Sequence, residues 1–237
     1  MDLAKIMKTP HTAEQIGALW TAYHAAKSQS PTSKVYLSGT IPTATYEQLI
    51  SKVPTYPCFI VPLPRPDALV EPASDATGTC TTQGTPHEFY FMQWGMHGPP
   101  PTPSPDGLPP LFNQPSSSSF QNVPNPMCTT VLFTSLQEYK LRQDYATPHL
   151  ILTHYTDLAQ SHGLVLLRGE LTPSPSGGES TMLSPDNAQR LALLLQQFYL
   201  PPKGNDERGA ARAKLLQRFH EEPEAFRWED VVDSIVL

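Results

Sequence analysis

The chain has 237 residues, enough for one large or two small domains with a buried core. It carries 16 lysines and arginines against 22 aspartates and glutamates, a formal net charge of -6, and no block of like charge stands out. A nucleic-acid surface and a polybasic membrane anchor both need clustered cations, so the sequence argues against both.

Cysteine usage and hydropathy narrow the class further. Three cysteines, Cys58, Cys80 and Cys128, form no CxxC pair, which indicates a reducing compartment and no disulfide framework. No apolar run approaches the roughly 20 residues that span a bilayer, so we expect no membrane insertion. The start, Met1 to Lys5, shows neither a signal peptide nor an Arg- and Ser-rich transit segment.

Two helices and two strands are predicted in the first hundred residues. Thr12 and Gln15 have capping-box spacing, which predicts a helix over residues 12–27 with one apolar face. A second, shorter helix is predicted over 43–52. Residues 58–63 indicate a buried strand that ends in prolines, and 87–94 indicate an aromatic strand with large side chains on both faces.

The segment 99–126 is the clearest low-complexity stretch, with ten prolines in its 28 positions and a run of four serines. Such a sequence buries too little apolar surface to offset its ordering entropy, so we expect it to be disordered. It should interrupt a hairpin between the 87–94 strand and a strand over 128–133. A further segment, 67–86, is expected to be a loop.

Elements follow one another closely after this insert. Ser135 and Glu138 predict a capped helix to about Tyr145. Strands are predicted over 149–155 and 164–171, separated by a short helix that Thr156 caps and Gly163 ends. Strong helices are predicted over 185–199, 206–222 and from 223 onward, the last docked by its apolar residues.

These elements predict one α+β domain over residues 1–237. We expect a mixed, largely antiparallel sheet of about five strands, flanked by helices and carrying the long Pro/Ser-rich loop.

No pattern typical of an enzyme site is present. Cys58 opens an apolar strand, where a free cysteine is ordinarily a packing residue and not a nucleophile. His149 and His154 are five apart on a strand, which places them on opposite faces and not around one metal ion. Glycine-rich nucleotide loops and a nucleophile elbow are absent. We therefore expect no metal and no cofactor, although an enzyme with an unrecognised site remains an alternative.

The proline motifs raise another alternative. Pro62-Leu63-Pro64-Arg65-Pro66 and the prolines from Pro99 to Pro103 are similar to polyproline II ligands of SH3 or WW domains. A Pro-rich adaptor is thus a second hypothesis, against the simpler interpretation of a spacer and a strand-ending loop.

A set of segments, taken in order, resembles the mitochondrial assembly chaperones that hold the β subunit of the F-type ATP synthase catalytic head. The resemblance covers nearly the whole chain. It is carried by Ile16, Trp20 and Tyr23; Phe59, Pro62, Leu63 and Pro64; Phe89, Phe91 and Gln93; Phe133 to Tyr139; Tyr155 to Ala159; Gly163 and Leu164; Gln196 to Tyr199; and Phe219 to Trp228. The Pro/Ser insert and the absent presequence depart from the family pattern.

The resemblance implies a monomeric chaperone of the mitochondrial matrix, without ATPase activity. It would bind the free β subunit, prevent its aggregation and hand it to the α subunit. A chaperone of this kind needs an apolar patch with a polar rim, because an unpaired subunit exposes apolar interface. The predicted patch comprises Phe59, Pro62, Leu63, Phe89, Phe91 and Trp94.

Overall fold

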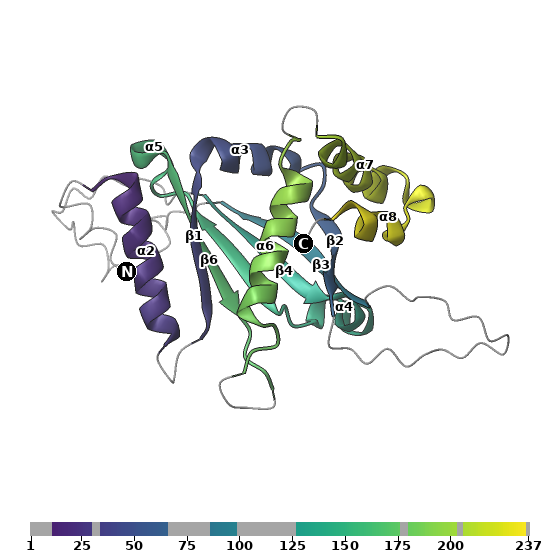
Figure 1. Ribbon diagram of the computed structural model, residues 1–237, viewed down its shortest axis with the longest axis horizontal. Coiled ribbons are helices and arrows are strands. Elements are labelled where there is room, and N and C mark those ends of the chain that lie inside the picture. The colour runs from purple at the N-terminus through teal and green to yellow at the C-terminus, as the bar shows by residue number, and fades with distance from the viewer. Residues whose placement is uncertain are drawn as a thin grey trace, which may run out of the picture.

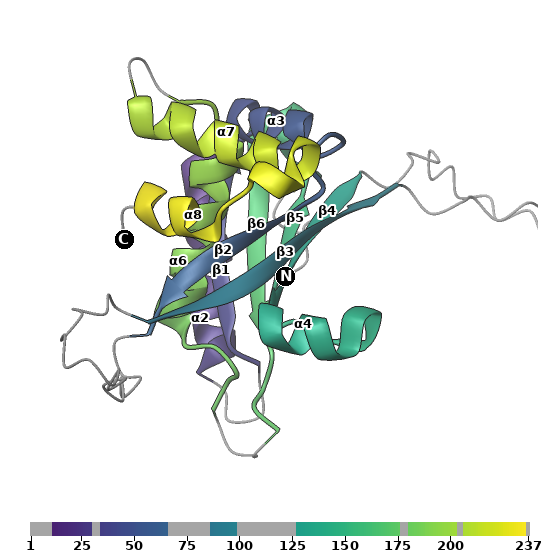
Figure 2. The same ribbon diagram turned by 90° about the vertical axis from the view of Figure 1, so that its right-hand side faces the viewer.

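The computed structural model describes residues 11–29, 34–65, 86–98, 127–175, 180–202 and 206–235. Its centre is one six-stranded sheet in the order β1-β6-β5-β4-β3-β2, with every neighbouring pair antiparallel. The strands twist strongly and the sheet curls like half of a barrel (Figures 1 and 2). The bounds are β1 (Tyr36–Pro42), β2 (Cys58–Pro64), β3 (His87–His97), β4 (Cys128–Ser135), β5 (Leu150–Tyr155) and β6 (Leu164–Leu171).

The α+β class and the antiparallel sheet are therefore confirmed, and the sheet has one strand more than the five expected. The additional strand is β1, an edge strand that pairs with β6. Ser38, Gly39 and Pro42 interrupt its apolar pattern, so its sequence lacks the alternation that marks the other strands.

Helices cover both faces of the sheet. Their bounds are α2 (Ala13–Ser28), α3 (Thr43–Lys52), α4 (Leu136–Arg142), α5 (Ala159–His162), α6 (Pro185–Tyr199), α7 (Glu207–Glu221) and α8 (Trp228–Ser234), with 3-10 turns at Gln143–Tyr145 and Pro223–Ala225. None of the described helices is long and apolar enough to cross a membrane.

Local capping explains why several helices begin where the sequence predicts. The capping box of α2 is formed: Gln15 N–H donates to Thr12 Oγ1 at 3.3 Å, and Thr12 N–H donates to Gln15 Oε1 at 3.0 Å. Ser184 caps α6 by accepting from Asn187 N–H at 3.3 Å. Gly163 ends α5 in the left-handed region, with φ of 62°, as predicted.

Two predicted caps are wrong. Ser135 makes no side-chain cap, because it still belongs to β4. The helix that follows ends at Arg142, since Gln143 takes φ of 52° and ψ of -123° and the chain continues as a 3-10 turn. Thr156 does not cap α5 either; its hydroxyl donates to the carbonyl of Met127, and α5 begins only at Ala159.

The main core lies on the face of the sheet that α3, α6, α7 and α8 cover. Alternate residues of the strands point into it, among them Val61, Tyr90 and Phe133, all fully buried. An apolar stripe of α6 faces this core and comprises Leu191, Leu194, Leu195 and Phe198. The C-terminal segment docks as expected, through Phe226 and Val231.

The opposite face is covered in two separate places. Helix α2 packs over β1 and β6, where Ile16, Trp20, Leu158, Leu164 and Leu166 form a second, smaller cluster. Helix α4 packs against β3 and β4 near the other side of the sheet. The predicted loop 67–86, apart from Pro86, and the insert 99–126 lie outside the described residues.

Candidate partner-binding surface

Strand β3 separates its large side chains between the two faces of the sheet. Tyr90, Met92 and Trp94 point into the main core, whereas Phe89 and Phe91 point to the opposite face and are half-buried. The register with β2 places Phe91 beside Ile60 and Phe89 beside Pro62 on that opposite face. The large side chains on the two faces of β3 therefore lie in different surroundings: one set is in the main core and the other is half-buried on the opposite face.

The six residues of the predicted patch do not lie on one surface. Phe59 and Leu63 are completely buried in the main core, where Phe59 packs on Phe198 with ring centroids 4.8 Å apart. Trp94 is also in this core, stacked on His154 at 5.7 Å. The other three, Pro62, Phe89 and Phe91, share the opposite face, and Pro62 is buried there.

Two further aromatic residues join Phe89 and Phe91 on the opposite face. Tyr139 of α4 lies against Phe91 with ring centroids 4.2 Å apart, and Trp228 of α8 meets Phe89 edge to face at 5.6 Å. Trp228 reaches Phe89 across the edge strand β2 while remaining 52% exposed. We call these four residues, Phe89, Phe91, Tyr139 and Trp228, the aromatic strip.

Helix α4 extends the strip with exposed apolar side chains. None of its residues is buried, and Leu141 is 79% exposed. Tyr145, in the 3-10 turn that follows, is 90% exposed. Figure 2 shows α4 standing out from the sheet beside β3 and β4. A helix that buries little and exposes large apolar residues is typical of an interaction surface.

Only part of this surface is predictable from the sequence. Leu136, Tyr139 and Leu141 are spaced so that they cannot share one face of a helix, and the segment is too short for a clear periodicity. Trp228 lies close in sequence to Phe226 and Val231, which dock the C-terminal segment on the core, and its sequence position does not separate it from them.

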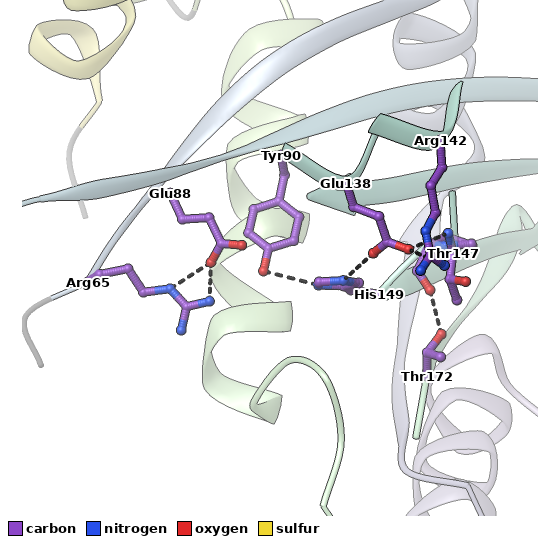
Figure 3. A network of polar contacts seen from close by, with 9 residues as sticks. Arg65, Glu88, Tyr90, Glu138, Arg142, Thr147, His149 and Thr172 are labelled. Atoms are coloured by element: carbon purple, nitrogen blue, oxygen red, sulfur yellow. Dashed lines mark hydrogen bonds and ion pairs between the residues drawn. The ribbon is translucent and has the colours of Figure 1, made fainter. Parts of the chain in front are cut away.

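A chain of polar contacts positions α4 against the sheet (Figure 3). Buried His149 lies between two partners: its Nδ1 is 3.4 Å from the Tyr90 hydroxyl and its Nε2 is 3.4 Å from Glu138 Oε2 of α4. Glu138 Oε1 also accepts from Thr147 N–H at 3.2 Å and lies 3.6 Å from Arg142. These contacts fix α4 although its apolar residues contribute little buried surface.

The same network continues toward the other edge of the sheet. Glu88 pairs with Arg65, whose Nε donates to Glu88 Oε2 at 2.7 Å. Burial, with Glu88 nearby, raises the pKa of Tyr90 far above its ordinary value, so its hydroxyl stays protonated and can donate to His149. Tyr90 thus lies between the Glu88–Arg65 pair and the His149 contact that leads to α4.

The outer edge of β2 is closed to strand addition. Arg65 N–H donates to the Pro86 carbonyl at 2.8 Å, so the odd-numbered residues of β2 bond to β3 and the even-numbered ones face outward. Pro62 and Pro64 offer no N–H there, and His220 Nε2 donates to the outward Cys58 carbonyl at 2.7 Å. We therefore expect a partner to contact this region through side chains and not through a continued ladder.

The candidate chemical groups are poorly suited to catalysis. Burial raises the pKa of the Cys58 thiol, which disfavours the thiolate that a nucleophile requires. Burial lowers the pKa of His154 to about 4, and its Nδ1 is occupied by the Thr129 hydroxyl at 3.1 Å. Within the described ranges, no three His, Cys, Asp or Glu side chains are grouped as metal ligands.

Several known proteins are similar to this chain over most of its length. The mitochondrial protein atp11 of Schizosaccharomyces pombe is 29% identical over 219 residues, which are 92% of this chain and 55% of that protein. The ATP synthase mitochondrial F1 complex assembly factor 1 of Mus musculus is 24% identical over 224 residues, 94% of this chain and 48% of its own length. Its Homo sapiens counterpart is also 24% identical over 224 residues, with 47% of its length covered.

This chain spans about half the length of these curated relatives. The model of one protein family, described as ATP11 protein, matches residues 1–232, which is nearly all of the chain. The chain therefore belongs to the ATP11 family.

Proposed function

We propose that this protein is a non-catalytic assembly factor of the mitochondrial matrix that binds, as a monomer, the free β subunit of the ATP synthase F1 head. It would cover apolar surface of that subunit, prevent its aggregation and yield it to the α subunit. The observation that carries the proposal is family membership, because relatives are named F1 complex assembly factors.

The aromatic strip, together with Leu141 and Tyr145, is the surface that best suits this task. An orphaned subunit presents an interface of the obligate kind, which is rich in apolar side chains and binds exposed aromatic and aliphatic residues. Tyrosine and tryptophan are the residues most often dominant in binding energy. Of the six residues predicted from sequence, we retain Phe89 and Phe91, with Pro62 as their support.

The release step also fits a surface of this size. A chaperone must bind the subunit more weakly than the true partner does, so that the α subunit can displace it. The aromatic strip, with the exposed Leu141 and Tyr145 beside it, offers contact without the large buried area of a permanent interface.

Co-expression with the isolated β subunit tests the proposal. The wild-type chain should keep the subunit soluble and co-elute with it. The double substitution Leu141→Ser with Tyr145→Ser should weaken the complex about tenfold or more, because both side chains are exposed and their loss affects binding rather than folding.

A matched control uses exposed leucines elsewhere. Leu19 on α2 and Leu193 on α6 are 43% and 47% exposed, so Leu19→Ser with Leu193→Ser makes the same kind of substitution at exposed apolar positions away from α4. This variant should bind as the wild type does. Equal binding by both double variants would show that α4 is not the contact surface, and a wild-type chain that leaves the β subunit insoluble would contradict the function itself.

A further inference from the structure

A hollow lies between α7 and α8, away from the aromatic strip. It has a volume of about 350 Å³ and an apolar floor that includes Ala211 and Leu215. Figure 2 shows the two helices side by side beyond the edge of β2, on the opposite side of the molecule from α4. We call this hollow the α7–α8 groove. Its remaining lining residues are Arg208, Lys214, Arg218, Asp230, Asp233 and Ser234.

The walls of the α7–α8 groove carry opposite charges. Arg208, Lys214 and Arg218 line the α7 side, and Asp230 and Asp233 line the α8 side. Among the ion pairs between described residues, none involves any of these five side chains. The groove therefore presents two separated strips of charge, one positive and one negative, with apolar surface between them.

Both strips have an intrinsic cost to the folded chain. Lys214 and Arg218 are four apart on α7, and Asp230 and Asp233 are three apart on α8, so each pair places like charges on one helix face. Like charges at these spacings destabilise a helix by a few tenths of a kcal/mol. A partner that supplies the opposite charges would remove this repulsion.

A buried cation beside the groove joins its two helices. Arg212, which is 9% exposed, donates from Nη1 to the Ser234 carbonyl at 3.1 Å and pairs through Nη2 with Asp206 at 3.3 Å. These contacts tie α7 to the end of α8. Arg212 thus helps to set the spacing of the two helices. The charged side chains of the groove walls take no part in this contact and are available to a binding partner.

We infer that the α7–α8 groove receives an amphipathic helix of the proposed partner, the F1 β subunit. The acidic residues of that helix would face α7, its basic residues would face α8, and its apolar ridge would lie on Ala211 and Leu215. The inference rests on the proposed function and adds a second, charged contact to it. A helix is the occupant that suits a channel between two helices, because its ridge of side chains packs between theirs. Charge complementarity fixes its direction and register.

Reversal of each wall tests the inference in the full-length chain. Arg208→Glu with Arg218→Glu reverses the α7 wall, and Asp230→Lys with Asp233→Lys reverses the α8 wall. Binding is measured to isolated F1 β subunit and, in a separate arm, to isolated α subunit. We expect each reversal to weaken binding to the β subunit about tenfold and to leave the α-subunit arm unchanged, and wild-type binding to the β subunit to weaken as salt rises from about 50 to 300 mM.

The control for the α7 wall is Lys27→Glu with Arg190→Glu, which makes the same change of net charge at exposed positions outside both the groove and α4. It should bind as the wild type does, and all variants should stay folded, with melting temperatures within a few degrees of the wild type, since the wall side chains form none of the ion pairs between described residues. A loss of binding confined to the wall variants would support the inference.

Three outcomes would overturn it. If the wall variants bind both subunits as the wild type does, the groove is not a binding site. The proposed function would stand in that case, provided that the Leu141→Ser with Tyr145→Ser variant still loses the β subunit. Self-association of the wild type that the wall variants abolish would assign the groove to a second copy of this chain. Failure of the wild type to bind either subunit would overturn both proposals.

Discussion

His154 is a titratable side chain placed deep in the main core. It is 1% exposed, its ring stacks on Trp94, and Thr129 Oγ1 bridges it to the Tyr46 hydroxyl at 3.1 and 3.2 Å. Burial lowers its pKa to about 4, so the folded protein keeps the imidazole neutral where an unfolded chain, with a pKa near 6.5, would protonate it. Burial lowers the pKa of His24 as well.

The sign of the resulting pH dependence follows from proton counting. Between the lowered pKa and about 6.5 the unfolded chain binds more protons, so the free energy of unfolding falls as pH decreases through this window. Urea unfolding should show His154 alone removing about 2 kcal/mol between pH 7.5 and pH 5. The variant His154→Gln should be less stable at pH 7.5 and should lose correspondingly less on acidification.

His97 provides the control for this measurement. Its imidazole is exposed on the sheet, so His97→Gln should retain the wild-type dependence of stability on pH. If His154→Gln showed the full wild-type loss, other groups would account for the acid sensitivity.

Helix α2 is attached to the sheet more independently than the other long helices. Its buried residues belong to the smaller cluster, separate from the main core. The Trp20 indole N–H donates to the Leu167 carbonyl at 2.8 Å, and this buried bond joins the helix to β6. An element held by its own small cluster can open without global unfolding.

Hydrogen exchange should detect this local opening. Trp20→Ala removes the largest side chain of the cluster and the bond to Leu167, a loss of about 3 kcal/mol that should speed exchange of α2 amides roughly a hundredfold. Amides of α6, in the main core, should change little. Trp228→Ala serves as the matched control, because this exposed tryptophan is remote from α2. Uniform acceleration in both helices would mean that α2 unfolds only with the whole domain.

Elements with strong local signals were predictable from the sequence, and those that depend on tertiary contacts were not. The capping box at Thr12, the Ser184-Pro185 start of α6 and the glycine at the end of α5 each act within one helix, and all three formed as expected. Strand β1 was missed because its position against β6, and not its composition, makes it a strand. The end of α4 was misplaced because Gln143 takes a rare backbone conformation.

At the scale of the molecule, the candidate surface was only half visible in the sequence. Phe59, Leu63 and Trp94 are as apolar as Phe89 and Phe91; alternation along the strands places the two groups on opposite faces, and only the folded sheet shows which face lies in the main core. Tyr139 and Trp228 join them from helices about 50 and 140 residues further along the chain. Such a surface arises from contacts distant in sequence, which a single sequence does not encode locally.

The Pro-rich adaptor hypothesis can be decided at this same scale. Its first motif loses support from the structure, since Pro62 and Leu63 are buried within β2 and cannot dock in an aromatic groove while the sheet is intact. The second motif, beginning at Pro99, belongs to the segment 99–126, outside the described residues. Its contribution to binding therefore has to be measured by deletion.

Replacing residues 99–126 by a short Gly/Ser turn should leave capture of the β subunit unchanged. The ends to be joined are close, because His97 of β3 and Cys128 of β4 are register partners at the open end of this strand pair. A shorter connection also lowers the entropy cost of closing the hairpin, although only slowly with length. Co-elution with the β subunit and the thermal melting curve give the result: a folded deletion variant that no longer captures the subunit would move the binding determinant from the aromatic strip to the insert.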